Sequence, residues 1–265
     1  MAKNTAAATP LTRYGSRVRV MSPGPGTATA SGSSAARPTP ATPAPTIRTM
    51  VICLPDELPR DTLTAHQLDR HFGVTGTLFA GFWATPALHR WQRTHLIGLR
   101  KGRPVCCAGG PVNLLDLTGM RHAAGLGAGI RHQLWTHVVH DTRPATPWPT
   151  FHARHLADPS KYPMDTARAD YHNQPRVNAV RMHNAVTYGA SQLDLAELEM
   201  FQAGLVAYQH YRAVNVLVRD AVLTAQGAKL APDSDALTHR VTYLEQANRY
   251  LDSLEPTQRL LTITL

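Results

Sequence analysis

The sequence predicts a mainly α-helical protein with a disordered N-terminal tail, and three observations support this. Residues 1–49 are rich in Ala, Thr, Ser, Pro and Gly. Over most of the remaining chain, apolar residues recur at steps of three and four, which is the spacing of an amphipathic helix. Only three or four short segments have the composition of strands. We therefore expect three parts: a tail over 1–49, a small unit over 50–110 and a helical domain over 111–265.

The tail has seven prolines and no helical or alternating pattern. Such a segment buries too little apolar surface to offset the entropy lost on ordering, so we expect it to be disordered. It contains six basic and no acidic residues. Three interpretations stay open: a flexible extension, a basic arm that touches nucleic acid, and an organelle transit peptide.

The charge of the whole chain is concentrated in this tail. The net charge is +9, of which the tail contributes +6, so that 21 basic and 18 acidic residues remain after position 49. This balance argues against an extensively basic face on the folded part, although local patches remain possible. No apolar run approaches the ~20 residues of a membrane span. The three cysteines form no disulfide framework, which predicts a reducing, cytoplasmic setting without membrane contact.

Within 50–110, the spacing predicts a strand over 50–54 and two helices over 63–72 and 76–91. The helices depend on apolar residues in helical spacing, and Gly73 suits the turn between them because that corner needs a positive φ. The apolar residues concerned are Leu68, Phe72, Val74, Phe79 and Phe82.

This segment resembles the helix-turn-helix domains of bacterial transcription regulators, whose common form runs T-x-x-Q-L-x-x-x-F-G-V-[ST]. The resemblance covers about twenty residues and implies DNA contacts from the second helix. Two positions depart from it: Asp69 replaces a small residue, and 76–83 has only Thr75 and Thr77 nearby to contact bases. The matching residues are Thr64, Gln67, Leu68, Phe72, Gly73, Val74 and Thr75.

A β-hairpin is predicted over 94–108, with Arg100, Lys101 and Arg103 around a glycine at its tip. A hairpin with such a tip can act as a wing that lies along phosphates or enters a minor groove. The alternative is an exposed turn whose charges only keep it soluble. Together with the preceding helices, the hairpin completes a winged helix-turn-helix-like unit.

In the helical domain we expect helices over 111–123 and 128–140, separated by a glycine-rich turn. A proline-rich connection over 141–163 follows. Two long antiparallel helices are predicted near the C-terminus. In the first, Asp194 and Glu197 form a capping box, an apolar stripe continues through Tyr208, and Gly227 marks its end. The second begins after Asp233 or Ser234 and stops at Pro256, and the alternating residues 261–265 predict a last strand.

Three functional hypotheses follow. The first is a DNA-binding regulatory protein in which Thr75, Thr77, Arg100, Lys101 and Arg103 contact DNA. The second is an enzyme or anionic-ligand-binding protein built on a polar cluster in 162–185. The third is a structural or assembly protein that forms homo-oligomers through its C-terminal helices. The cluster of the second hypothesis consists of Arg168, Asp170, His172, Arg176, Arg181 and His183.

Metal and cofactor chemistry have weak support in the sequence. His137 and His140 share one face of a predicted helix and could contact a single ion. No cysteine pair lies near them and no H-E-x-x-H signature occurs, so we expect no metal site. No phosphate-binding loop signature follows a predicted strand, so we expect no cofactor either.

Overall fold

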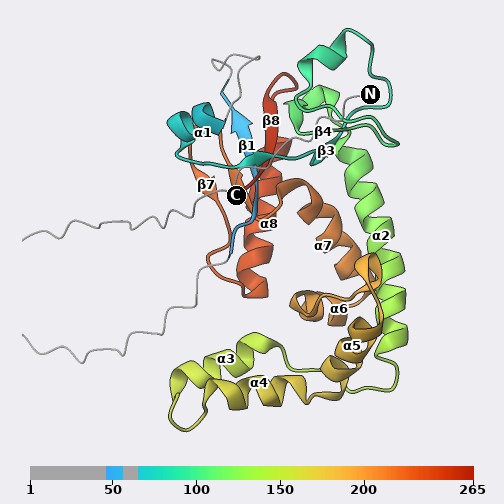
Figure 1. Ribbon diagram of the computed structural model, residues 1–265, viewed down its shortest axis with the longest axis vertical. Coiled ribbons are helices and arrows are strands. Elements are labelled where there is room, and N and C mark those ends of the chain that lie inside the picture. Colours follow the sequence, from blue (N-terminus) through green and yellow to red (C-terminus); the bar gives the residue numbers. More distant parts are fainter. Residues whose placement is uncertain (1–45, 56–64) are drawn as a thin grey trace, which may run out of the picture. The chain divides into compact units, whose positions relative to one another are not determined.

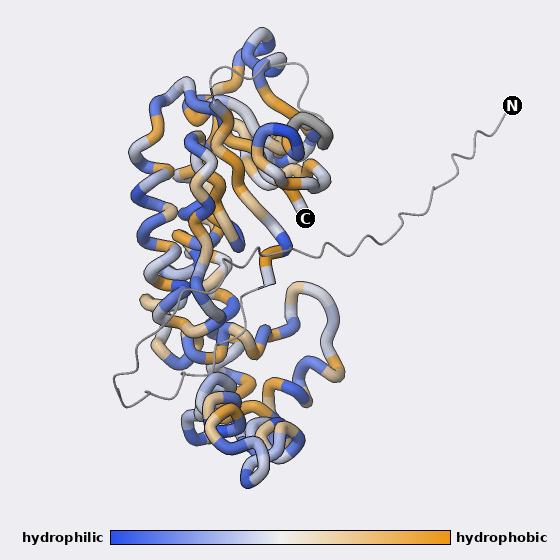
Figure 2. Tube along the Cα trace, turned by 90° about the vertical axis from the view of Figure 1, so that its left-hand side faces the viewer, coloured by the Kyte–Doolittle hydropathy of each residue, from blue (hydrophilic) through white to orange (hydrophobic). Residues whose placement is uncertain are grey.

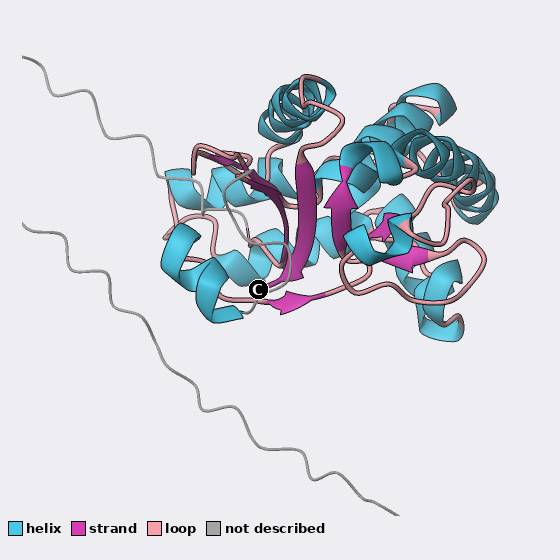
Figure 3. Cartoon of the chain, turned by 90° about the horizontal axis from the view of Figure 1, so that it is seen from above, coloured by secondary structure: helices cyan, strands magenta, loops and turns pink. Residues whose placement is uncertain are grey.

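A computed structural model describes residues 46–55 and 65–265. The expected disorder of the tail concerns mainly residues outside this described part. About half of the described residues are helical, which confirms the predicted predominance of helix. The helices surround a mixed β-sheet that is larger than the sequence indicates (Figure 3).

The sheet is built around its first and last strands (Figure 1). Strand β1 pairs in parallel with β6 on one side and antiparallel with β8 on the other. The outer edge of β8 receives both β2 and β5, and β7 extends the sheet beyond β6. The bounds are β1 Thr49–Leu54, β2 Thr77–Leu78, β5 Gly109–Pro111, β6 Ala221–Leu223, β7 Lys229–Leu230 and β8 Arg259–Thr264.

Both faces of the sheet are covered, which explains why its central strands read as continuous apolar runs. One face, with Val51 and Val222, packs against the long helices α2, α7 and α8. The other face, with Ile52 and Ile263, packs against Leu68 of the first helix. Figure 2 shows the helical coils alternating between hydrophilic and hydrophobic residues, as expected for helices with one buried face. The predicted strands at 50–54 and 261–265 are thus confirmed as β1 and β8.

Helix α2 (Leu117–Val138) is a single helix of 22 residues, so the prediction of two helices separated by a glycine-rich turn was wrong. Its glycines serve packing instead. A Cβ on Gly125 would lie 3.8 Å from the backbone oxygen of Gln209, and one on Gly129 would lie 2.8 Å from the Gln209 amide nitrogen. These small residues let α7 (Leu205–Val218) approach α2 closely (Figure 1).

The first of the two long C-terminal helices is broken, which corrects the prediction. Gly204 has φ +100°, a conformation that no helix interior accepts, and it separates α6 from α7. After α7 the chain enters β6, because Ala221–Leu223 pairs with β1. The second helix is present as α8 (Leu237–Asp252) and contacts α7. The separate pieces are η4 Leu195–Glu197 and α6 Leu198–Gln202.

Residues 141–163, predicted as a connection, contain helix α3 (Trp148–Ala157). The helix forms because Trp148 and Phe151 pack against a buried cluster that includes Tyr171 and Leu198. Two further helices, α4 (Met164–His172) and α5 (Pro175–Val186), follow it.

The structure overturns the helix-turn-helix prediction. Helix α1 (Ala65–Phe72) is present and Gly73 has φ +61°, as expected for the turn. The second helix, predicted over 76–91, is absent from that described stretch. Its first residues form β2, which pairs with Ile263 and Thr264, and the next form β3 (Phe82–Trp83). Helical spacing misled the interpretation because strand pairing decides this stretch: Leu78, half-buried, pairs with β8, and Phe82, buried, pairs with Cys107.

Candidate nucleic-acid interface

A long acid-free segment of the folded chain carries the positive charge. Residues 70–115 contain six basic and no acidic residues, which leaves 15 basic and 18 acidic residues in the rest of 50–265. The modest net charge of the folded part therefore hides a separation into a basic segment and an acidic remainder. Such a separation creates a local positive potential that attracts polyanions.

The predicted hairpin reverses the chain as expected. Ile97 and Gly109 form one antiparallel bridge, and Arg100 and Cys106 form another. The Arg100 amide donates to the Cys106 carbonyl at 2.7 Å, and the Cys106 amide donates back at 3.2 Å. On its other side, β4 (Cys106–Cys107) pairs with β3, which contacts α2. In Figure 1, β3 and β4 lie side by side at the upper end of α2.

The side chains of Arg100, Lys101 and Arg103 are exposed at the hairpin tip. Exposed arginines at 90 and 93 extend the basic surface along the chain. Within residues 46–55 and 65–265, none of these five side chains forms an ion pair or a hydrogen bond. Their charges are therefore available to a ligand.

An exposed tryptophan lies within this basic segment, and sequence reasoning missed it. Trp91 is 67% exposed. Its ring stacks on His89, with centroids 6.4 Å apart and planes inclined by 3°, and His95 meets it edge-on at 6.3 Å. Beside it lies an open hollow of about 190 Å³ that includes Asn113 and Gln92. The sequence Arg-Trp-Gln-Arg at 90–93 could have indicated this site, because it places an aromatic residue between two cations. The assignment of 76–91 to a helix led us to overlook it.

The 3-10 helix η1 (Gln92–His95) holds this arrangement in place. The His89 amide donates to the side-chain oxygen of Gln92 at 2.8 Å, and the Thr94 hydroxyl donates to the Trp91 carbonyl at 2.7 Å. Both bonds close local turns, so the backbone on either side of Trp91 is fixed while its ring faces solvent.

The two threonines of the DNA hypothesis lie apart from a recognition helix. Thr75 is exposed in the link between α1 and β2. Thr77 is exposed in β2, where it pairs with Thr264. Neither residue is on a helix that could enter a major groove, so the interpretation of 76–83 as a recognition helix was wrong.

The polar cluster predicted over 162–185 is divided by the structure. Arg176 is engaged inside the helical part, where it donates to Thr142 and Gln202 and lies over the Trp135 ring at 5.3 Å. Burial lowers the pKa of the Arg176 guanidinium. Asp170 accepts a hydrogen bond from Tyr162 at 2.7 Å. These contacts join α5 to Thr142 and to the end of α6, and they join the link before α4 to α4 itself.

The remaining members of that cluster lie closer to solvent. His183 contacts the Ser191 carbonyl at 2.9 Å, and Arg168 pairs with Asp165 at 3.8 Å. Burial, and then the charges of Arg181 and Arg168, lower the pKa of His172. The Nδ1 atom of His172 is buried and has no hydrogen-bond partner in the described part of the chain. Burial and the two arginine charges therefore disfavour protonation of His172.

Among the described residues, no group of three or more His, Cys, Asp or Glu side chains could hold a metal ion. His137 lies in the last turn of α2, and His140 lies beyond it, where its Nδ1 meets an oxygen of Asp141 at 2.9 Å. His132, earlier on α2, contacts the carbonyl of Phe201 at 3.1 Å.

Of the two residues predicted to form a capping box, Asp194 caps as expected and the buried Glu197 has another role. Asp194 does accept a hydrogen bond from the Ala196 amide at 2.8 Å, as a capping residue should. Glu197 accepts from the Tyr208 hydroxyl at 2.7 Å and from Arg212 at 2.5 Å. Burial, followed by the hydrogen bond to Glu197, raises the pKa of Tyr208 well above its usual range, so Tyr208 remains a donor. These three side chains connect η4 to α7.

Comparisons of the chain with protein-family models, curated proteins and solved structures found no significant match. None of the described helices has the length and apolar character needed to cross a membrane.

Proposed function

We propose that this protein binds nucleic acid through residues 89–103, with a preference for single strands. The observation that supports the proposal is an exposed Trp91 ring in the same short segment as five exposed cationic side chains, which have no partners in the described chain. Proteins that bind single strands combine these two features, because cations follow the phosphates and an aromatic ring stacks on an unpaired base.

The absence of a recognition helix in the described 65–110 segment favours this mode over duplex readout. Reading base edges in a major groove needs a helix or a β-ribbon carrying Arg, Asn or Gln. The hairpin provides cations at its tip, and phosphate contacts alone carry no sequence information. We therefore expect binding that depends weakly on sequence.

Fluorescence anisotropy with a labelled single-stranded oligothymidine, and with a duplex of equal length, tests the proposal. Removing one stacking contact costs about 1–3 kcal/mol. Trp91→Ala should therefore weaken single-strand binding roughly 5- to 150-fold and affect duplex binding less. Tyr188→Ala is the matched control, because Tyr188 is an aromatic residue that is 86% exposed outside the segment. Equal loss in both variants would refute a stacking role for Trp91.

A further inference from the structure

Two hollows lie next to each other beside the first turn of α8 and share Asp235 and Arg240 in their walls. The smaller has a volume of about 60 Å³ and lies where β1 and β6 begin. The larger, about 240 Å³, continues toward the start of α3. Pockets for drug-sized ligands measure ~300–1,000 Å³, so an occupant of these hollows must be small.

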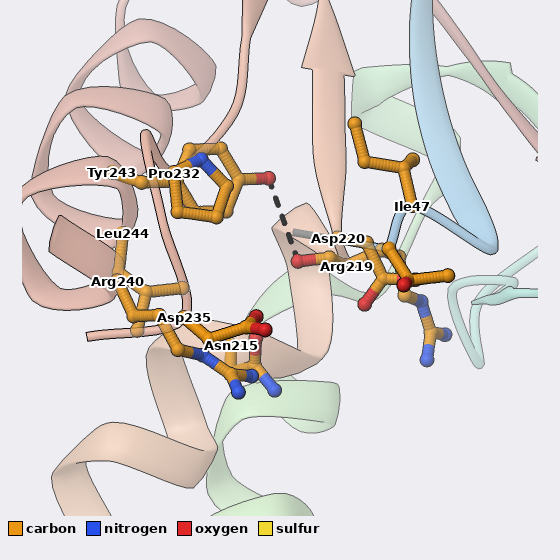
Figure 4. Close-up of a pocket in the computed structure, with 10 residues that line it drawn as sticks. Ile47, Asn215, Arg219, Asp220, Pro232, Asp235, Arg240, Tyr243 and Leu244 are labelled. Atoms are coloured by element: carbon orange, nitrogen blue, oxygen red, sulfur yellow. Dashed lines mark hydrogen bonds between the residues drawn. The ribbon is translucent and has the colours of Figure 1, made fainter. Parts of the chain in front are cut away.

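The wall of the smaller hollow is held by groups that already have partners (Figure 4). The Tyr243 hydroxyl donates to the Val218 carbonyl at 2.7 Å. One oxygen of Asp220 accepts from the amides of Arg48 and Thr49 at 3.0 and 2.9 Å. These contacts fix the wall and leave little capacity for a ligand.

Four other polar side chains that line the hollows lack a partner in the part of the chain that the structure describes. Within the described residues, the side chains of Asn215, Asp235, Arg240 and Glu199 form no ion pair or hydrogen bond. Figure 4 shows Asn215, Asp235 and Arg240 directed toward the same space from α7, from the loop before α8 and from α8. Burial raises the pKa of the Glu199 carboxyl, so a cation beside it would be stabilising.

The larger hollow adds an apolar wall made of Trp148, Leu195 and Leu198. Two neighbouring rings fix the orientation of the Trp148 ring. It stacks on His152, with centroids 5.9 Å apart, and it meets the Tyr171 ring edge-on at a centroid distance of 5.5 Å. A ring fixed in this way offers a flat surface to an apolar group or to a cation.

We propose that the two hollows form one binding site for a small zwitterion, an amino acid with an apolar side chain. Its carboxylate pairs with the Arg240 guanidinium, and its ammonium group lies between Glu199 and Asp235. Its side chain lies against Trp148 and Leu195. This site is separate from the nucleic-acid interface and does not depend on it.

The charges select this class of ligand over simpler ones. An apolar molecule would cover Arg240 and two carboxylates without pairing them, which is costly. A phosphate would meet two like charges. An amino acid pairs all three groups and leaves the apolar wall for its side chain.

Isothermal titration calorimetry of the full chain with L-phenylalanine, 3-phenylpropionate and phenethylamine tests the proposal. L-Phenylalanine should bind saturably, and each truncated analogue should bind at least about tenfold more weakly, because it leaves a charge unpaired. No saturable heat with L-phenylalanine at millimolar concentrations would overturn the proposal. Equal binding of phenethylamine would also overturn it, because the site would then recognise only a cation.

Two variants locate the site. Arg240→Ala should weaken L-phenylalanine binding at least about tenfold, and so should the nearly isosteric Glu199→Gln, which guards against a folding defect in the first variant. Arg249→Ala is the control, because Arg249 is exposed on the same helix and lines neither hollow. Unchanged binding in Glu199→Gln and Arg240→Ala would overturn the assignment. All three variants should bind oligothymidine as the unaltered protein does, so a failure here is distinguishable from a failure of the proposed function.

Discussion

Breaking the buried contact between Glu197 and Arg212 should destabilise the fold strongly. Glu197 is 9% exposed, and in Arg212→Met its carboxylate would keep only the Tyr208 hydroxyl as a donor. Removing one partner of a buried pair costs about 3–5 kcal/mol. The Arg212 side chain is 37% exposed, so water can reach the site and we expect the lower end, ~3 kcal/mol. For a chain of this size, such a loss lowers Tm by about 6–12 °C.

Glu197→Gln should cost less, about 1.5–3 kcal/mol, because glutamine still accepts from Tyr208 and only the charge-assisted bond is lost. The double variant, Glu197→Gln with Arg212→Met, buries no unpaired charge. It should therefore be more stable than the sum of the two single losses predicts, by about 0.5–3 kcal/mol.

Urea unfolding followed by far-UV circular dichroism measures each free energy of unfolding. Arg249→Met is the control, because an exposed substitution should change stability by no more than about 0.5 kcal/mol. Additive single losses, or a loss below about 1 kcal/mol in Arg212→Met, would show that this network does not stabilise the junction between η4 and α7.

Three further predictions concern particular side chains. Gly127→Ala should raise the free energy of unfolding by about 0.5–1 kcal/mol, because nothing lies within 4 Å of the added Cβ. Gly109→Ala should lower the free energy of unfolding, because its Cβ would meet the backbone of β8. Burial and two neighbouring arginines lower the pKa of His172, so urea midpoints should fall as the pH drops below about 6.5, and less in His172→Asn. Burial raises the pKa of the Cys107 thiol to about 11, so a thiol reagent at neutral pH should label Cys106 first; equal labelling would contradict the buried position of Cys107.

The sequence predicts the elements whose signal is local. Met50–Leu54 and the C-terminal strand were recognisable as short apolar or alternating runs, and Gly73 indicated a turn correctly. The helix α8 was predictable from its apolar face and from the proline that follows it. Each of these features is set by residues close together in the chain.

The errors arise where distant contacts override local spacing. Residues 77–83 have helical spacing but form two short strands. Residues 77 and 78 pair with β8, about 185 residues away, and Phe82 and Trp83 pair with β4. Gly125 and Gly129 suggest a turn, yet they lie inside α2 because α7 packs on them. Trp91 was overlooked as a site residue because 76–91 was assigned to a helix, although the neighbouring Arg90 and Arg93 could have indicated the site.

The salt dependence of oligothymidine binding tests the proposed function most directly. The logarithm of the affinity should fall linearly with the logarithm of salt concentration. Replacing Arg100, Lys101 and Arg103 with Ala should reduce the slope by about two units, at ~0.7 per phosphate contact on a single strand. The control removes equal charge from exposed residues outside the segment, Arg143, Lys229 and Arg249, and should leave the slope unchanged. Equal slopes in the unaltered protein and the hairpin variant, or no salt-sensitive binding, would contradict the proposal.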